Sequence, residues 1–340
     1  MSEQNRIDWL DGAKGYALLA VMLGHLIEGM NLQISRITGV ETWPILAILY
    51  SFDIPAFFMI SGYLFKMPET GFFTYLKRKL RGLILPYFIL GIIIVLAYMA
   101  INGELSAFFL KKHLLELVVQ NRYQTLWYLA SAFLALLLFY LLVWATRGRQ
   151  VVLGIVATAI LVLGLAYYRL GGGPLPWNLD TVPVACFFVW VGYLLRQHDF
   201  TDRRFVFPLT LVLALAFTFS NMLLGGWYLN MYWCQYSIEP LVIAAAVTGS
   251  LALLAFARLW APAPVKLLGR KSLIFFALHQ VVSVELWEII CRNLHLFLKQ
   301  GMVNFVLYIV LGMVFVLVTM AIVQIIYDMF RGLVARDRQA

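Results

Sequence analysis

Long stretches almost free of charge decide what this chain can fold into. Four of the clearest cover residues 82–101, 151–168, 205–224 and 303–327. A helix needs about 20 apolar residues to cross a hydrocarbon core roughly 30 Å thick, and these stretches have that length. Hydrophobic residues make up 63% of the chain and charged residues 13%, whereas soluble domains have about 45–50% and about 25%. The sequence therefore predicts an all-α integral membrane protein.

Charged and turn-forming segments divide the chain into ten expected membrane spans. They leave little for a separate soluble domain, so residues 1–340 are expected to form a single membrane domain. No internal repeat is evident, which counts against many transporter folds. The sixth span is short enough to be re-entrant instead. The expected spans are residues 12–30, 45–65, 82–101, 125–144, 151–170, 181–195, 206–222, 237–257, 272–291 and 303–327.

The basic residues are divided unequally between the two sides of this topology. An even number of spans places both termini on one side. If that side is cytoplasmic, the inner segments carry 19 of the 26 Lys and Arg residues, as the positive-inside rule requires. Topology thus explains the net charge of +9, and nucleic acid is not expected as a partner. Asp8 and Asp11 precede the first apolar stretch, so a cleaved signal peptide is not expected either.

The first span carries Lys14 and His25, and ionisable groups at membrane depth usually face a cavity and have a function. The two are eleven residues apart, which places them within about 20° of one another on a helix and about 16 Å apart along its axis. Coenzyme A has phosphates at one end and its thioester at the end of a long arm. Lys14 could hold phosphate at the cytoplasmic entrance, while His25 acts as the general base on a sugar hydroxyl. A purely structural His25 is the alternative.

Two further residues are candidates for the same chemistry. Glu28 follows His25 by three residues and could orient its imidazole; alternatively it lies at the outer water interface. His279 is the second histidine within a span, with Gln280 and Ser283 nearby. It is expected either in the active site or in a helix-to-helix hydrogen bond.

Each of the other polar and aromatic candidates has two possible interpretations. Asp180, at the start of the sixth span, could bind a sugar hydroxyl or act as the N-cap of that helix. Trp127 could line a sugar-binding mouth or anchor the outer interface. Arg78 and Arg81, in the basic run before the third span, could bind cofactor phosphates or serve as a cytoplasmic anchor.

The remaining chemically active residue types give no motif. Three cysteines are widely spaced without a CxxC pair or metal-ligand spacing, so they are expected to pack in apolar surroundings. No metal is expected. The other histidines, at positions 113, 198 and 295, are expected in loops without a special role.

Several of these residues lie in motifs that occur in a known order. The opening RIDWLDGAKG through LGH (residues 6–15 and 23–25) resembles acyltransferase family three, the integral membrane O-acyltransferases that modify cell-envelope sugars. SFDIPAFFMISGY (51–63), KRKLRGLILPY (77–87) and LWYL (126–129) are similar to its next three helices. Asp180 and the segment from LGRKSL to Leu278–His279 continue the agreement. Within the family, the chain is most similar to the fucose 4-O-acetylase-like branch.

This resemblance implies a membrane-bound O-acyltransferase of the inner (cytoplasmic) membrane that uses acetyl-CoA. The acceptor would be a hydroxyl of a cell-envelope or lipid-linked sugar, and membrane lipids and envelope glycan-assembly proteins are the expected partners. The family's functional positions carry over as Lys14, His25, Arg78, Arg81 and His279. Arginine is the usual residue where Lys14 stands, so phosphate attraction is retained but bidentate geometry is not.

Two other functional classes remain as alternatives at this point. The first is a proton-coupled transporter or flippase for a sugar or lipid-linked saccharide, with His25 and His279 as a proton relay. The second is a structural membrane subunit without chemistry, which leaves the intramembrane Lys14 and His25 unexplained.

Overall fold

The computed structural model describes residues 7–33, 42–120, 122–297 and 301–337, and this part of the chain is helical without strands. Arg6, which opens the first motif, lies outside it. The helices are α1 (Asp8–Gln33), α3 (Trp43–Tyr63), α4 (Phe72–Lys79), α5 (Leu85–Asn102), α6 (Ala107–Val119), α7 (Trp127–Ala145), α8 (Gln150–Arg169), α9 (Val182–Gln197), α10 (Val206–Leu223), α11 (Glu239–Leu259), α12 (Ala263–Arg270), α13 (Ser272–Leu278), α14 (Glu285–Asn293) and α15 (Met302–Asp337).

Ten segments of the described chain are long and apolar enough to cross a membrane, which confirms the all-α, multi-pass prediction. Each overlaps one expected span, and the sixth, Pro176–Gln197, has 22 residues. The main difference lies between spans. Residues 107–119, expected as a loop, form the helix α6, whose first turn is capped by the Ser106 side chain accepting a hydrogen bond from the Phe109 amide.

Two short π-helical turns interrupt the spans. One covers Leu80–Ile84 and joins α4 to α5; the other covers His279–Val284 and joins α13 to α14. An extra residue per turn shifts the register of the side chains that follow it, and π-bulges often occur at functional sites. The second π-helix begins at His279, one of the candidate active-site residues.

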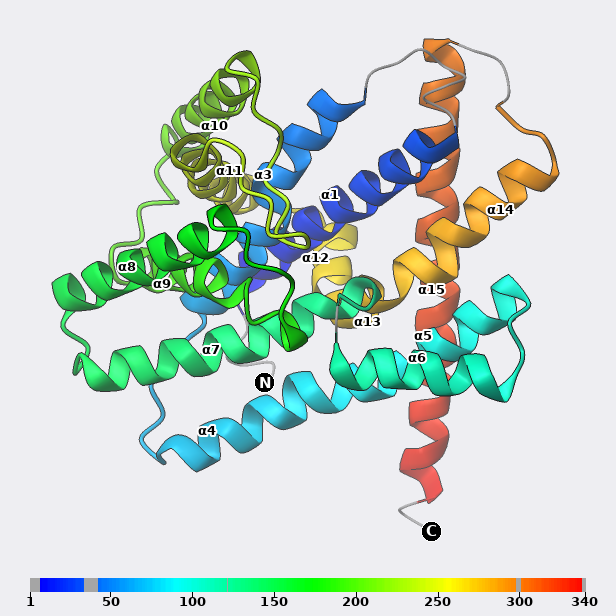
Figure 1. Ribbon diagram of the computed structural model, residues 1–340, viewed down its shortest axis with the longest axis horizontal. Coiled ribbons are helices and arrows are strands. Elements are labelled where there is room, and N and C mark those ends of the chain that lie inside the picture. The colour runs from blue at the N-terminus through cyan, green and yellow to red at the C-terminus, as the bar shows by residue number, and fades with distance from the viewer. Residues whose placement is uncertain (1–6, 34–41, 121, 298–300, 338–340) are drawn as a thin grey trace.

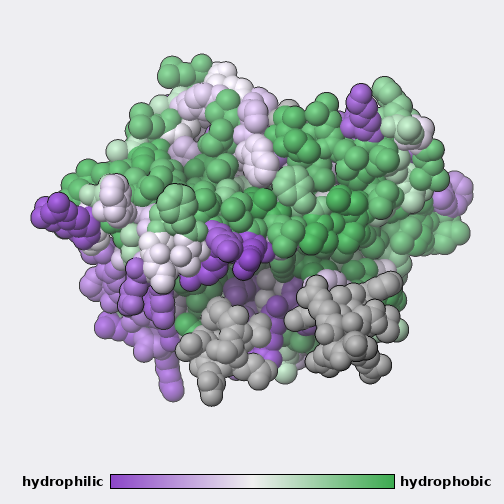
Figure 2. Space-filling view, turned by 90° about the horizontal axis from the view of Figure 1, so that it is seen from below, coloured by the Kyte–Doolittle hydropathy of each residue, from purple (hydrophilic) through white to green (hydrophobic). Residues whose placement is uncertain are grey.

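The helices around α1, α3, α9 and α11 form the centre of the molecule (Figure 1). Helix α1 packs on α3, α11 and α12, and α3 also packs on α9 and α11. Helices α8, α10 and α15 are more peripheral and are buried over less of their length. Figure 2 shows the broad hydrophobic surface of one face, with hydrophilic residues gathered toward one edge. Such a surface suits lipid, because lipid tails are as apolar as leucine.

Glycines allow one of the central helix pairs, α3 and α9, to approach closely. A Cβ on Gly62 would lie 1.9 Å from the Val189 carbonyl oxygen, and one on Gly192 would lie 1.8 Å from that of Met59. The crossing of α3 and α9 therefore depends on a glycine from each helix. Small residues serve the same purpose in membrane helix pairs generally.

Charged residues gather where the start of α1 meets the ends of other spans. Asp199, just after α9, binds the Arg258 guanidinium at the end of α11 and accepts a hydrogen bond of 2.6 Å from the Tyr63 hydroxyl at the end of α3. Arg258 in turn lies over the Trp9 ring, 4.0 Å from its centroid. The start of α1 and the ends of α3, α9 and α11 thus meet at one end of the bundle, as an alternating up-and-down course requires.

Candidate active site

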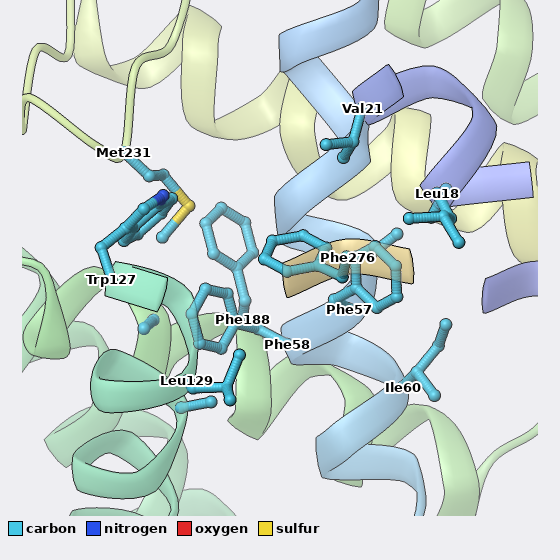
Figure 3. Packing of buried hydrophobic residues seen from close by; sticks show 14 of the residues in the cluster. Leu18, Val21, Phe57, Phe58, Ile60, Trp127, Leu129, Phe188, Met231 and Phe276 are labelled. Carbon is cyan, nitrogen blue, oxygen red and sulfur yellow. The ribbon is translucent and has the colours of Figure 1, made fainter. Parts of the chain in front are cut away.

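A cavity of about 560 Å³ lies between α1, α3, α6 and the hairpin turn closed by the Asn230–Gln235 backbone bridge. Its wall combines carboxylates, histidines and aromatic rings. The lining residues are Val21, His25, Glu28, Tyr50, Asp53, Ile54, Tyr98, Lys112, His113, Glu116, Arg122, Tyr123, Gln124, Thr125, Trp127, Leu229, Asn230, Met231, Tyr232, Trp233, Phe276 and Gln280. Figure 3 shows Trp127 beside Met231 and the packed rings of Phe57 and Phe276.

His25 and Glu28 form a pair on the cavity side of α1. The His25 Nδ1 lies 3.3 Å from a Glu28 carboxylate oxygen, and the two side chains are 23% and 38% exposed. Tyr50 lines the same cavity as this pair. With Nδ1 facing the carboxylate, the Nε2 of His25 is the nitrogen free to accept a proton. The arrangement matches a general base held by an acidic partner.

His279 lies against His25 from a helix remote in sequence. The two ring centroids are 5.3 Å apart with a tilt of 40°. The His279 side chain is fully buried, and its Nδ1 lies 3.0 Å from the carbonyl oxygens of both Phe275 and Phe276. Carbonyls accept hydrogen bonds, so Nδ1 carries the proton and Nε2 is an acceptor. That Nε2 has no hydrogen-bond partner among the described residues.

Asp53 is a cavity residue that sequence reasoning did not select. It is 2% exposed, in the middle of α3, and its carboxylate accepts a hydrogen bond of 2.6 Å from the Ile54 amide. It lines the same cavity as His25 and Glu28. A single aspartate in an otherwise uncharged span was the available signal, because such residues are costly in a membrane.

The structure at the start of the sixth span differs from the interpretation of Asp180 as an N-cap. Helix α9 begins at Val182 with Thr181 as its N-cap, and no side chain caps it. The Asp180 carboxylate instead pairs with the Arg122 guanidinium, and both side chains are buried. The N-cap interpretation of Asp180 is therefore wrong, because a buried arginine takes the carboxylate. Asp180 does not line the main cavity, whereas Trp127 does.

His113 is also placed differently from the expected loop. It lies in α6, is 6% exposed and lines the cavity. Its Nδ1 lies 3.2 Å from Glu116 and its Nε2 lies 3.2 Å from Glu104. Both ring nitrogens of His113 therefore face carboxylate oxygens. The turn of α6 brings Glu116 to the ring, and the connection between α5 and α6 brings Glu104 to it.

A family model described as an acyltransferase domain matches residues 7–325, nearly the whole chain. The chain belongs to acyltransferase family 3. It is therefore a multi-pass membrane acyltransferase. No curated protein and no solved structure matches it. Within the described part of this acyltransferase, no group of three or more His, Cys, Asp or Glu residues could hold a metal ion, and the three cysteines are buried free thiols.

The acyltransferase holds the expected donor-binding residues away from the cavity. The Lys14 ammonium lies 3.5 Å from an Asp11 carboxylate oxygen, and the other oxygen lies 3.5 Å from Arg270 of α12. Arg78 and Arg81 are exposed on α4 and the π-helix that follows it. None of the three expected cations, Lys14, Arg78 or Arg81, lines the cavity.

Packed apolar side chains separate the Lys14 end of α1 from the cavity. Leu18 and Val21 lie between Lys14 and His25 on the same helix face, and they are 0% and 2% exposed. Phe57 and Phe276 cover this region with ring centroids 5.7 Å apart (Figure 3). Lys14 and His25 lie in one continuous helix, so their expected spacing is confirmed. Packed apolar side chains, however, fill the helix face between them.

Proposed function

We propose that the protein transfers an acetyl group from acetyl-CoA to a hydroxyl of a cell-envelope or lipid-linked sugar, in a cytoplasmic membrane with both termini inside. The observation that carries the proposal is the His25–Glu28 pair on a cavity wall, 3.3 Å between nitrogen and oxygen. Family membership supports acyl transfer in general. The aromatic rings of Trp127 and Tyr232, with centroids 5.8 Å apart on the same wall, offer the apolar faces against which a sugar ring can lie.

In the proposed reaction, the Nε2 of His25 removes the proton of the acceptor hydroxyl. The hydroxyl oxygen attacks the thioester carbonyl carbon, and the carbon–sulfur bond then breaks. The coenzyme A thiolate leaves and takes the proton back from the imidazolium, so the products are an acetyl ester and free coenzyme A. Glu28 holds the ring in place and stabilises its protonated form, which is the role of the acidic member of a catalytic triad.

The donor is proposed to enter from the end of the bundle where Lys14, Arg78 and Arg81 lie. A phosphate group there would meet a lysine point charge and exposed guanidinium groups. The distance of about 16 Å between Lys14 and His25 along α1 suits an extended pantetheine arm. Because Leu18 and Val21 are packed on the connecting face, donor binding has to move side chains apart along it.

The proposal is tested with purified protein in lipid nanodiscs, acetyl-CoA labelled in the acetyl group, and a panel of methyl glycosides as acceptors. Wild-type protein is expected to form an acetylated glycoside and one free thiol per ester. His25→Ala should lower the rate by about 10²–10⁴-fold, the usual contribution of a general base. His198→Ala, an exposed histidine after α9, is the matched control and should keep the wild-type rate.

A wild-type rate of acetyl transfer in His25→Ala would show that His25 is not the general base. The alternative of a transporter or flippase has one observation in its favour, the 5.3 Å contact of the two intramembrane histidine rings, which resembles a proton relay. Sugar movement into liposomes that depends on a proton gradient and ignores acetyl-CoA would favour that function instead.

A further inference from the structure

Arg122 is the most constrained charged residue on the cavity wall. It is 7% exposed, and its Nη2 pairs with the Asp180 carboxylate. Its Nε donates to the Tyr232 carbonyl, and the Tyr232 hydroxyl donates back to the Arg122 carbonyl. These contacts join the segment before α7, the start of α9 and the hairpin turn after α10. The guanidinium is thus fixed in position before any ligand arrives.

One donor of this fixed guanidinium is left over. The Nη1 of Arg122 is buried and has no hydrogen-bond partner among the described residues, although Arg122 lines the same cavity as His25. Buried polar groups are nearly always paired, and an unpaired one calls for an explanation. A donor that is charged, immobile and next to a cavity is suited to an oxygen supplied by a ligand.

A second cation lies on the same cavity wall as Arg122. Among the described lining residues, Lys112 is the second side chain with a permanent positive charge. The lining carboxylates are engaged elsewhere: Glu28 pairs with His25, and Glu116 pairs with His113. The third, Asp53, accepts a hydrogen bond from the Ile54 amide. Arg122 is itself paired with Asp180, so it contributes its unpaired Nη1 donor, and Lys112 contributes the further positive charge on this wall.

We propose that Arg122, assisted by Lys112, binds an oxyanion of the acceptor, while the hydroxyl to be acylated faces His25. The acceptor class is then a sugar that carries a carboxylate or a phosphate. The two sources share the planar or tetrahedral array of oxygens that a guanidinium recognises. The identification of this ligand as the acceptor rests on the proposed acyl transfer, but binding of the anion can be measured without any reaction.

The test measures binding of three probes to the full chain in nanodiscs, followed by tryptophan fluorescence, because Trp127 and Trp233 line the cavity. The probes are methyl β-glucoside, methyl β-glucuronide and methyl β-glucoside 6-phosphate, which differ at one carbon. At least one anionic probe should bind about 10- to 100-fold more tightly than the neutral one, the range expected for a hydrogen bond to a charged group. The preferred anion identifies the source of the oxyanion.

The variants separate anion binding from a structural role of the ion pair. Arg122→Gln and Lys112→Gln should each reduce the preference for the anion, and Lys112 is exposed, so its replacement should not disturb folding. Asp180→Asn breaks the same buried pair as Arg122→Gln but keeps the guanidinium, so it should keep the preference. Equal binding of all three probes, no binding of either anion, or an unchanged preference in Arg122→Gln would overturn the proposal. If the protein binds an anionic probe more tightly but acetylates none of the three probes, the anion subsite is supported and the proposed reaction is contradicted.

Discussion

The imidazole rings of His25 and His279 lie 5.3 Å apart, centroid to centroid, although the two residues come from opposite ends of the chain. The two carbonyl contacts of the His279 Nδ1, each 3.0 Å, fix the orientation of that ring. A neutral imidazole with an available lone pair stands beside the proposed base. It can stabilise the positive charge that His25 acquires during transfer.

This relationship predicts that His279→Leu lowers kcat by about 10- to 100-fold with little change in the KM for acetyl-CoA, since the lost interaction forms only when His25 is charged. Steady-state kinetics in nanodiscs would measure both constants. Val281→Ala is the control, because Val281 is fully buried in the same π-helix and its truncation should affect stability more than kcat. Equal kinetic losses in the two variants would indicate a packing role for His279.

Glu28→Gln is expected to lower kcat by roughly 10–10³-fold, because an amide keeps the size of the side chain but cannot stabilise the imidazolium as a carboxylate does. Binding of acetyl-CoA, followed by its retention on immobilised protein, should be unchanged. Glu69→Gln, an exposed residue between α3 and α4, should behave as wild type. A Glu28→Gln variant with wild-type kcat would support the alternative in which Glu28 is only an interfacial residue.

Gly192→Ala should destabilise the protein, because the added Cβ would lie 1.8 Å from the Met59 carbonyl oxygen and force α3 and α9 apart. Overpacking of this kind costs about 1–3 kcal/mol. Gly82→Ala is the matched control, since no atom lies within 4 Å of the added Cβ, and alanine is the better helix former. Thermal unfolding in detergent distinguishes them, and equal melting temperatures would mean that the helix crossing is looser than described.

The sequence was sufficient to predict the spans and their number, because charge-free length is a property of each segment alone. It was also sufficient for the placement of Lys14 and His25 on one face, since a single helix carries both. The contact between His25 and His279 was beyond such reasoning. It depends on how α13 packs against α1 and on the π-turn that starts at His279, and neither the packing nor the register change is visible in a hydropathy pattern.

The partners of Asp180 and His113 show the same limit. Asp180 is an evident candidate in the sequence, but its partner Arg122 lies 58 positions away, in a short segment between two expected spans. The role of His113 is hidden for the same reason, since the sequence does not predict α6 as a helix. In each case the polar residue was visible in the sequence. Its partner was determined by tertiary packing, which short-range periodicity does not encode.

Asp199 provides a stability prediction whose pH dependence has a definite sign. Burial alone would raise the pKa of Asp199, but hydrogen bonds from the Tyr63 hydroxyl and from Thr201, with the charge of Arg258, outweigh it and hold the pKa below its ordinary value. A carboxyl whose pKa is lowered on folding stabilises the native state above its unfolded pKa, about 3.9. That contribution is lost as the pH falls through the lower, folded value. Asp199→Asn should therefore lower the free energy of unfolding at neutral pH by about 1–3 kcal/mol, the range for hydrogen bonds to a charged group.

The difference between wild type and Asp199→Asn should shrink as the pH is lowered from about 5 toward 3, because protonation removes from the wild type the same charge that the variant lacks. Melting temperatures in detergent across this range measure it. Asp202→Asn, three residues into the same connection and exposed, should follow the wild-type curve. A constant difference at every pH would mean that the Asp199 side chain acts through packing and not through its charge on Arg258.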